Sequence, residues 1–390
     1  MILFEYLAEL VLSQLENRQP KELPAEVSVE ELVKIAVKSH MSTLLLGALL
    51  KLDLPEEQKQ PLTSSVLSHI LLSYSQQNEF QQLIKAFEEN NIHSQPMKGV
   101  FMKQYYPKPE LREMSDIDIL ISEDQLEQAE GILTNLGYAF SSKESHHDIY
   151  RKANNRKLVL EVHWTMYDGH VDKNQHDYFH NFSRAIPMEG CKHTYTFTKE
   201  DFYVFMISHM AKHFYARGCG IRNLVDIYVY QKKFGEELDK AHIKRELKKC
   251  GIYDFARHME TLSDLWLNKK ECSEFYLQLF HYMLDCGIYG KDENGMWNKY
   301  ANAKTGGKET SAFQLKLWYL FPPMDYMEEW YPWIKGKKLL LPIGWVVRFL
   351  GGITKNKGAN KREYLKHADN EHVLILQNIY RQMGLKFTKH

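Results

Sequence analysis

The chain has 390 residues, which is too long for one ordinary hydrophobic core, so more than one compact unit is expected. Its 50 lysine and arginine residues balance its 50 aspartate and glutamate residues, which excludes a global field that would attract nucleic acid or an anionic membrane. Its five cysteines are scattered and form no CxxC pair, so we expect neither a disulfide framework nor a zinc ribbon, and a cytoplasmic location fits best.

Residues 1–90 are predicted to be helical. In residues 1–18, acidic side chains interrupt the apolar ones at helical spacing and a basic start is absent, so this segment predicts a packed amphipathic helix and not a signal peptide. Ser28 and Glu31 have the spacing of a capping box. A long helix is expected over residues 62–90.

Residues 91–190 alternate between short extended runs and helices, which predicts an α+β core with a mixed sheet. The expected strands are 92–97, 115–121, 138–141, 146–152 and 157–164. The expected helices are 100–106 and 123–136, the second closed by Gly137. The asparagine-rich segment 153–156 has the chemistry of a hairpin turn.

Residues 191–390 are again predicted to be helical. His209 and His213 have the i,i+4 spacing of zinc-binding histidines, but the glutamate of an HExxH motif is absent, so we expect them to pack or to contact the site indirectly. Arg222 and Asp226 have the spacing of an ordinary helical ion pair.

One stretch near the C-terminus, residues 330–352, interleaves aromatic and basic residues. Contact with a membrane surface or with RNA stays an alternative to helix packing there. The apolar run 339–350 is too short to cross a membrane and contains Pro342 and Arg348, so no transmembrane segment is predicted.

The strand 115–121 carries the strongest functional signal. Asp116 and Asp118 share one face, while the isoleucines between and after them point into a core. Glu161 is a lone acid on one face of the strand 157–164. Neighbouring carboxylates need a compensating cation, and Mg²⁺ prefers oxygen ligands of this kind. Salt bridges from the aspartates to Arg112 or Lys98, with Glu161 at the surface, are the alternative.

Residues before the aspartates suggest that one side of this site binds phosphate. Lys98 and Gly99 follow a predicted strand and precede a short helix, where a glycine admits phosphate to the backbone and a lysine supplies a point charge. Arg112 offers a bidentate phosphate contact. The alternative is that Gly99 only permits a turn. His163 shares a face with Glu161, where it would orient the carboxylate, contact substrate or simply pack.

In order, these pieces are MKG at 97–99, QYY at 104–106, Arg112, SDIDILI at 115–121 and EVHW at 161–164. Together they resemble the nucleotidyltransferase superfamily with a DNA polymerase β type of palm, and in particular its uncharacterised bacterial nucleotidyltransferases. The resemblance covers about 100 residues well, and the helical flanks only loosely.

The resemblance implies that Asp116, Asp118 and Glu161 are catalytic and hold one or two Mg²⁺ ions, Glu161 also helping to activate the acceptor. It implies a nucleotide-binding set of Lys98, Gly99, Arg112, Ser115 and His163. Most active members carry Gly-Ser where this chain has Lys98-Gly99, so the serine that helps to hold the triphosphate is absent.

We therefore expect a central nucleotidyltransferase-like domain at 91–190, between helical regions at 1–90 and 191–390. Its expected activity is Mg²⁺-dependent transfer of a nucleoside monophosphate from NTP to an unidentified hydroxyl or phosphate acceptor. A catalytically inactive module that binds a nucleotide or a partner, and an antitoxin or biosynthetic accessory protein, are the alternatives.

Overall fold

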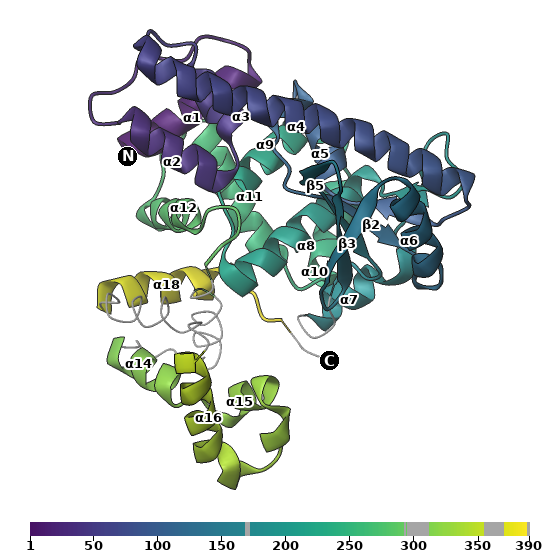
Figure 1. Ribbon diagram of the computed structural model, residues 1–390. Coiled ribbons are helices and arrows are strands. Elements are labelled where there is room, and N and C mark those ends of the chain that lie inside the picture. Colours follow the sequence, from purple (N-terminus) through teal and green to yellow (C-terminus); the bar gives the residue numbers. More distant parts are fainter. Residues whose placement is uncertain (168–171, 292–293, 295–311, 355–369, 388–390) are drawn as a thin grey trace. The chain divides into compact units, whose positions relative to one another are not determined.

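The computed structural model describes residues 1–167, 172–291, 294, 312–354 and 370–387 (Figure 1). Two compact units are present. The first comprises Met1–Lys212, Cys219–Tyr289 and Lys386–His390, and the second comprises His213–Gly218 and Gly290–Leu385. The division of the chain at residues 90 and 190 stays a prediction.

The first unit begins with four helices. They are α1 (Ile2–Leu15), α2 (Val29–Ser39), α3 (Ser42–Leu49) and α4 (Glu56–Glu89). The Ser28 hydroxyl accepts a hydrogen bond from the Glu31 amide at 3.1 Å, so the serine half of the expected capping box forms. His40 adopts a left-handed conformation, φ 50°, and separates α2 from α3. The expected start of the long helix at residue 62 is wrong, because α4 begins at Glu56 and continues through Pro61.

A five-stranded mixed sheet follows, with strand order β1-β2-β5-β4-β3. Its strands are β1 (Ser94–Pro96), β2 (Ile117–Ile121), β3 (Tyr138–Lys143), β4 (His147–Lys152) and β5 (Asn155–His163). Only β2 and β5 are parallel, and the other neighbours are antiparallel. Helix α5 (Gly99–Tyr105) follows β1, and α6 (Leu126–Asn135) connects β2 to β3. The predicted α+β fold with a mixed sheet is confirmed.

One face of this sheet is buried against helices. Ile117, Ile119 and Ile121 of β2 pack there with apolar side chains of β5, α4 and α6. Helix α4 reaches from the N-terminal helices to the sheet, so it belongs to both parts of the first unit (Figure 1). Since strand side chains alternate, Asp118 projects from the opposite face of β2.

Helices on the C-terminal side complete the first unit. They are α7 (Lys173–Tyr178), α8 (Lys199–Arg217), α9 (Arg222–Phe234), α10 (Lys240–Lys249), α11 (Tyr253–Leu267) and α12 (Glu274–Cys286), with a small sheet of β6 (Ile186–Pro187) and β7 (Tyr195–Thr196). Helix α8 continues into the second unit. The Trp266 indole of α11 donates to the Phe4 carbonyl of α1 at 2.9 Å, which joins residues distant in sequence.

The second unit contains the described helices α14 (Ala312–Leu320), α15 (Met324–Trp330), α16 (Leu341–Thr354) and α18 (Asn370–Met383). Within the stretch 330–352, Trp330, Trp333 and Leu339 are exposed. Among the described residues, no helix has both the length and the apolar character to cross a membrane. Surface contact through 330–352 stays a prediction.

Candidate functional site

Strands β2 and β5 bring two carboxylates side by side. The strands are parallel neighbours, and their register pairs Asp118 with Glu161. Both side chains project from the face opposite the isoleucine core, because paired residues of a sheet share a face. Asp118 is buried and the Glu161 side chain is 22% exposed. The strand faces that the sequence predicted for Asp118 and Glu161 are thus adjacent in the sheet, and the two acids lie side by side.

His163 lies against both carboxylates. Its Nε2 is 3.2 Å from Asp118 Oδ1 and 3.5 Å from Glu161 Oε2. Burial opposes a charge on this imidazole, but its hydrogen bonds to the two acids outweigh burial and raise the pKa of His163. The structure therefore shows a buried histidine paired with the two carboxylates, and a role in orienting them or in contacting substrate stays a prediction.

Asp116 and Asp118 respond in opposite directions to their surroundings. Burial, followed by the charges of Asp118 and Glu161, raises the pKa of Asp116 to about 7. Burial also acts to raise the pKa of Asp118, but the Lys98 ammonium and His163 hold it below its usual range. Asp116 is therefore within electrostatic reach of Asp118 and Glu161, although the group of ligand atoms within 4.8 Å of one another contains Asp118, Glu161 and His163 and not Asp116.

Lys98 and Gly99 have separate roles in the structure. The Lys98 ammonium is 3.9 Å from Asp118 Oδ2, so the alternative of a lysine–aspartate ion pair is present. A Cβ atom on Gly99 would lie 2.7 Å from Met114 Sδ. The space that the missing side chain leaves is therefore filled by Met114, and the glycine has a packing role.

Arg112 does not present its bidentate face to the carboxylates of the site. Its Nε and Nη2 donate to the two oxygens of Asp226, each at 2.9 Å, and the Tyr106 hydroxyl donates to the same carboxylate at 2.8 Å. The Arg112 guanidinium, which was expected to bind phosphate, is thus already paired with a carboxylate of the protein. Asp226 pairs with this arginine and not with Arg222, which corrects the helical ion pair expected from spacing.

Arg222 was missed as a site residue. Its Nη1 donates to the Glu113 carbonyl at 2.9 Å, while its Nε is buried without a hydrogen-bond partner. Its charge acts to lower the pKa of Asp116, which follows Glu113 by three residues along the chain. No local pattern links the start of α9 to the strand β2, and only the packing of the helices brings them together.

Ser115, just before Asp116, is held by two distant segments. Its hydroxyl is 3.3 Å from His40 Nδ1 and 3.2 Å from the Tyr289 hydroxyl. The rings of His40 and Tyr289 meet edge to face, with centroids 5.1 Å apart. The structure therefore gives Ser115 partners in the helical flanks.

Two neighbouring histidines, His146 just before β4 and His147 at its start, were also missed. The register pairs His147 with His163, their rings stack at 4.6 Å, and His147 Nε2 is 3.5 Å from Glu161 Oε2. His146 Nε2 lies 3.2 Å from the Lys212 ammonium. The predicted hairpin already placed this segment beside β5. Counting residues back from the turn does not pair His147 with His163, however, because the register shifts between Arg151 and Lys152.

Two groups of side chains have the proximity that a metal ion needs. In each group, the ligand atoms lie within 4.8 Å of one another, and the groups are Asp118, Glu161 and His163, and His146, His147 and His163. Neither His209 nor His213 belongs to a group of this kind among the described residues.

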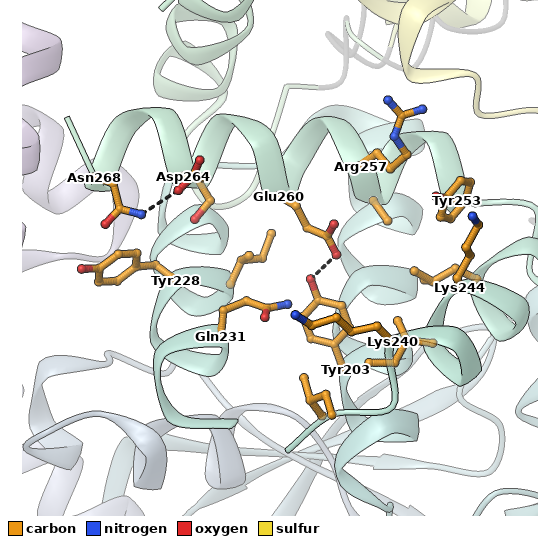
Figure 2. A pocket seen from close by; sticks show the side chains of 16 residues that line it. Tyr203, Tyr228, Gln231, Lys240, Lys244, Tyr253, Arg257, Glu260, Asp264 and Asn268 are labelled. Atoms are coloured by element: carbon orange, nitrogen blue, oxygen red, sulfur yellow. Dashed lines mark hydrogen bonds between the residues drawn. The ribbon is translucent and has the colours of Figure 1, made fainter. Parts of the chain in front are cut away.

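A separate cavity of about 510 Å³ lies among α8, α9, α10 and α11 (Figure 2). The Tyr203 hydroxyl donates to Glu260 at 2.6 Å on its wall, and Asn268 donates to Asp264 at 2.7 Å. None of the predicted site residues lines it. The candidate site is therefore the acidic face of the sheet.

A mixed sheet with carboxylates on two adjacent strands is the core that the resemblance implied for a nucleotidyltransferase. Residues 25–268, more than half of the chain, match the model of a family described as uncharacterised nucleotidyltransferases. The chain belongs to that family.

Solved structures add likenesses of low identity. The solution structure of the antibiotic-resistance factor ANT(2'')-Ia is 10% identical, with a TM-score of 0.26, over 50% of this chain and 94% of that one. Its crystal structure with adenylyl-2''-tobramycin is 12% identical, with a TM-score of 0.25, over 50% and 98%. An antigenic nucleotidyltransferase-like protein from Paracoccidioides brasiliensis is 17% identical, with a TM-score of 0.33, over 54% and 98%. No curated protein matches the chain.

Proposed function

We propose that this protein is a Mg²⁺-dependent nucleotidyltransferase that moves a nucleoside monophosphate from NTP to a hydroxyl or phosphate acceptor. The observation that carries the proposal is the pairing of Asp118 with Glu161 on one sheet face, with Asp116 in electrostatic reach of both. Family membership supports the same reaction class.

The residues present fit a divalent cation. Their donor set consists of carboxylate oxygens, and Mg²⁺ prefers such ligands. Asp116, Asp118 and Glu161 would hold the ion. When bound, Mg²⁺ stabilises the attacking and leaving oxygens of an in-line displacement.

The chain's own cations would bind the phosphates. Lys98 is the ammonium beside Asp118, and the charge of the partly unpaired Arg222 acts on Asp116. In the proposed reaction, the acceptor oxygen attacks the α-phosphorus, the bond from that phosphorus to the bridging oxygen breaks, and pyrophosphate leaves. Glu161 would accept the proton of a hydroxyl acceptor. Catalysis would rest on positioning and electrostatics, as is usual for phosphoryl chemistry.

Thermal unfolding with Mg²⁺ and each NTP tests binding. A ligand at about 100 times its Kd stabilises the folded state by about 2.7 kcal/mol, which is a readily measured shift. We expect one or more nucleotides to give such a shift, and Asp116→Asn with Asp118→Asn to abolish it. Asp254→Asn, whose side chain is 69% exposed, is the matched control and should keep the shift.

Transfer of label from an α-³²P-labelled NTP to members of an acceptor panel tests turnover. Acceptors should include sugars, RNA and proteins. Label that appears on an acceptor in the wild type and not in Asp118→Asn supports the proposal. Absence of any nucleotide-induced shift in melting temperature would refute it.

A nucleotide-binding module without turnover is the second candidate function. It is favoured by Met114, whose sulfur fills the space beside Gly99, and by the absence of a serine at this position. A melting shift that depends on Asp116 and Asp118, without label transfer to any acceptor, would favour this alternative.

A further inference from the structure

We propose that residues 330–354 form a surface that binds an anionic lipid membrane, with one apolar face of α16 entering the membrane boundary and a lysine-bearing turn lying on the headgroups. We call this segment the α16 surface. It lies within the second compact unit, whereas the acidic sheet face lies in the first. The inference is therefore independent of the proposed nucleotidyl transfer.

Helix α16 turns an apolar stripe outward. Ile343, Val346 and Val347 have the i, i+3, i+4 spacing of one helix face, and each is at least 41% exposed. Leu339, one turn earlier, is 94% exposed. The only charged residue of α16, Arg348, does not share this stripe. A helix at a water-covered surface ordinarily has the reverse arrangement, with its charged side outward.

The opposite side of α16 is packed within the unit. A Cβ atom on Gly344 would lie 3.1 Å from Met327 Cε, so α15 approaches the backbone of α16 closely. The Trp345 indole donates to a carbonyl just before α15 at 2.8 Å, and Arg348 donates to a carbonyl of α14 at 2.9 Å. These contacts fix the rotation of α16 about its axis, so the outward apolar stripe is part of the folded unit.

A turn that carries three lysines precedes the helix. Lys335, Lys337 and Lys338 are all exposed. Gly336 lies between them with a φ of 74°, which favours glycine, and its amide donates to the Glu328 carboxylate at 2.8 Å. The turn is therefore ordered, and it places its ammonium groups directly before the apolar stripe in the chain.

The charge of the α16 surface favours an anionic membrane. Residues 330–354 contain four basic residues and no acidic residue, although the whole chain is balanced. One lysine near an anionic membrane surface strengthens binding roughly fivefold. Trp333, close to the turn, is exposed, and tryptophan is enriched at membrane–water interfaces. An apolar helix face flanked by lysines and tryptophan is the composition of an interfacial helix.

Two other occupants fit this surface less well. A second copy of the chain, placed about a twofold axis, would bring the same lysines of both copies to one interface, and residues 330–354 offer no acid to balance them. RNA would meet the aliphatic side chains of Ile343, Val346 and Val347, which have no ring on which a base can stack. A membrane accommodates both features, because its acyl chains lie beneath charged headgroups.

Sedimentation of the full chain with lipid vesicles tests the charge. We expect binding to vesicles of phosphatidylcholine with about 30% phosphatidylserine, and binding at least about 100-fold weaker to phosphatidylcholine alone. The combined change Lys335→Gln, Lys337→Gln and Lys338→Gln should weaken binding to the anionic vesicles about 100-fold. The matched control makes the same change at three exposed lysines of α10 and should bind as the wild type does. These lysines are Lys240, Lys244 and Lys248.

A second pair of variants tests the apolar stripe. Ile343→Ser with Val347→Ser should weaken binding to the anionic vesicles by about 10- to 100-fold, because two apolar side chains no longer enter the membrane boundary. Leu67→Ser with Leu71→Ser changes two exposed apolar residues at the same spacing in α4 and should leave binding unchanged. Circular dichroism shows whether each variant folds. If the α16 variant does not fold, Val346→Gln replaces it and must weaken binding.

Several outcomes would overturn the proposal. The first is absence of binding to the anionic vesicles, and the second is equal binding by the wild type and by the folded lysine and α16 variants. A dimer in light scattering that Ile343→Ser with Val347→Ser converts to a monomer would identify a second copy as the occupant. Binding to single-stranded RNA in place of vesicles would identify a nucleic-acid surface.

Discussion

At the scale of single residues, the neighbouring carboxylates Asp116 and Asp118 have different surroundings, and these surroundings shift their pKa values in opposite directions. Lys98, at 3.9 Å, and His163, at 3.2 Å, lie against Asp118 and hold its pKa below the usual range, whereas burial and the charges of Asp118 and Glu161 raise the pKa of Asp116 to about 7. On the acidic face, negative charge is therefore concentrated at Asp118, which pairs with β5. Arg112 differs from these acids, because its charge is balanced by a single buried carboxylate, that of Asp226.

The Arg112–Asp226 pair should be a structural ion pair. Both side chains are buried, so Asp226→Asn leaves a buried guanidinium without its counter-charge, and unfolding free energy should fall by about 3–5 kcal/mol. The double variant Arg112→Met with Asp226→Leu should lose less than Asp226→Asn alone, since both charges are removed. Urea unfolding measures both. A loss under about 1 kcal/mol for Asp226→Asn would contradict the assignment.

Gly99 should be required for packing. In Gly99→Ala the new Cβ would meet Met114 Sδ at 2.7 Å, so we expect a loss of about 1–3 kcal/mol from overpacking. Met114→Ala removes the obstacle, and the double variant should be less destabilised than the sum of the single variants. Strict additivity in urea unfolding would show that Met114 is not the cause. Gly131→Ala, which has open space around the added carbon, is the control.

At the scale of elements, the loop before β2 is held by helices from both flanks. The Gln76 amide of α4 donates to the Met114 carbonyl at 3.0 Å, and the Thr43 amide of α3 donates to Glu113 at 2.8 Å. Arg222 of α9 holds the Glu113 carbonyl. The helical flanks therefore position the segment that carries the aspartates.

Removal of one of these supports should be measurable. Gln76→Leu keeps the size of a buried side chain but leaves the Met114 carbonyl without its donor, so stability should fall by about 1–3 kcal/mol. Gln82→Leu makes the same change at an exposed position of the same helix and should alter stability by no more than about 0.5 kcal/mol. Equal losses in thermal unfolding would mean that α4 does not hold the loop.

The strands were predictable because alternation along each one is a local property. Ile117, Ile119 and Ile121 carry that signal, and the facing of Asp118 and Glu161 follows from it. The role of Arg112 was not predictable, because Asp226 lies 114 residues away and is reached only through helix packing. The start of α4 was placed too late, because the helix begins directly after Pro55 and continues through Pro61.

At the scale of the whole molecule, equal numbers of acidic and basic side chains conceal strong local pairing. Glu246 is the clearest example, with a side chain only 1% exposed. It accepts hydrogen bonds from Lys249 at 2.8 Å, Arg245 at 2.9 Å and the Tyr178 hydroxyl at 2.9 Å. Burial acts against its charge, but these partners lower the pKa of Glu246 to about 2.

Glu246 should make stability depend on acid. Its pKa is lower in the folded state than the ordinary value of 4.5, so its contribution is present above pH 4.5 and is lost as the pH falls toward about 2. At neutral pH, Glu246→Gln should cost about 1–3 kcal/mol in urea unfolding, and the difference from wild type should shrink through that window. Glu237→Gln, at a side chain 59% exposed, is the control. A difference that does not change with pH would refute the linkage.

The position of β5 has a consequence for how the chain is made. This strand is the last of the five in sequence, yet it inserts between β2 and β4 in the sheet. During translation, β2 therefore leaves the ribosome well before β5. Until β5 is made, one edge of this isoleucine-rich strand has unpaired backbone N–H and C=O groups. An exposed edge of this kind invites aggregation, and charges beside it are the usual protection. In β2, Asp118 is a charge of this kind.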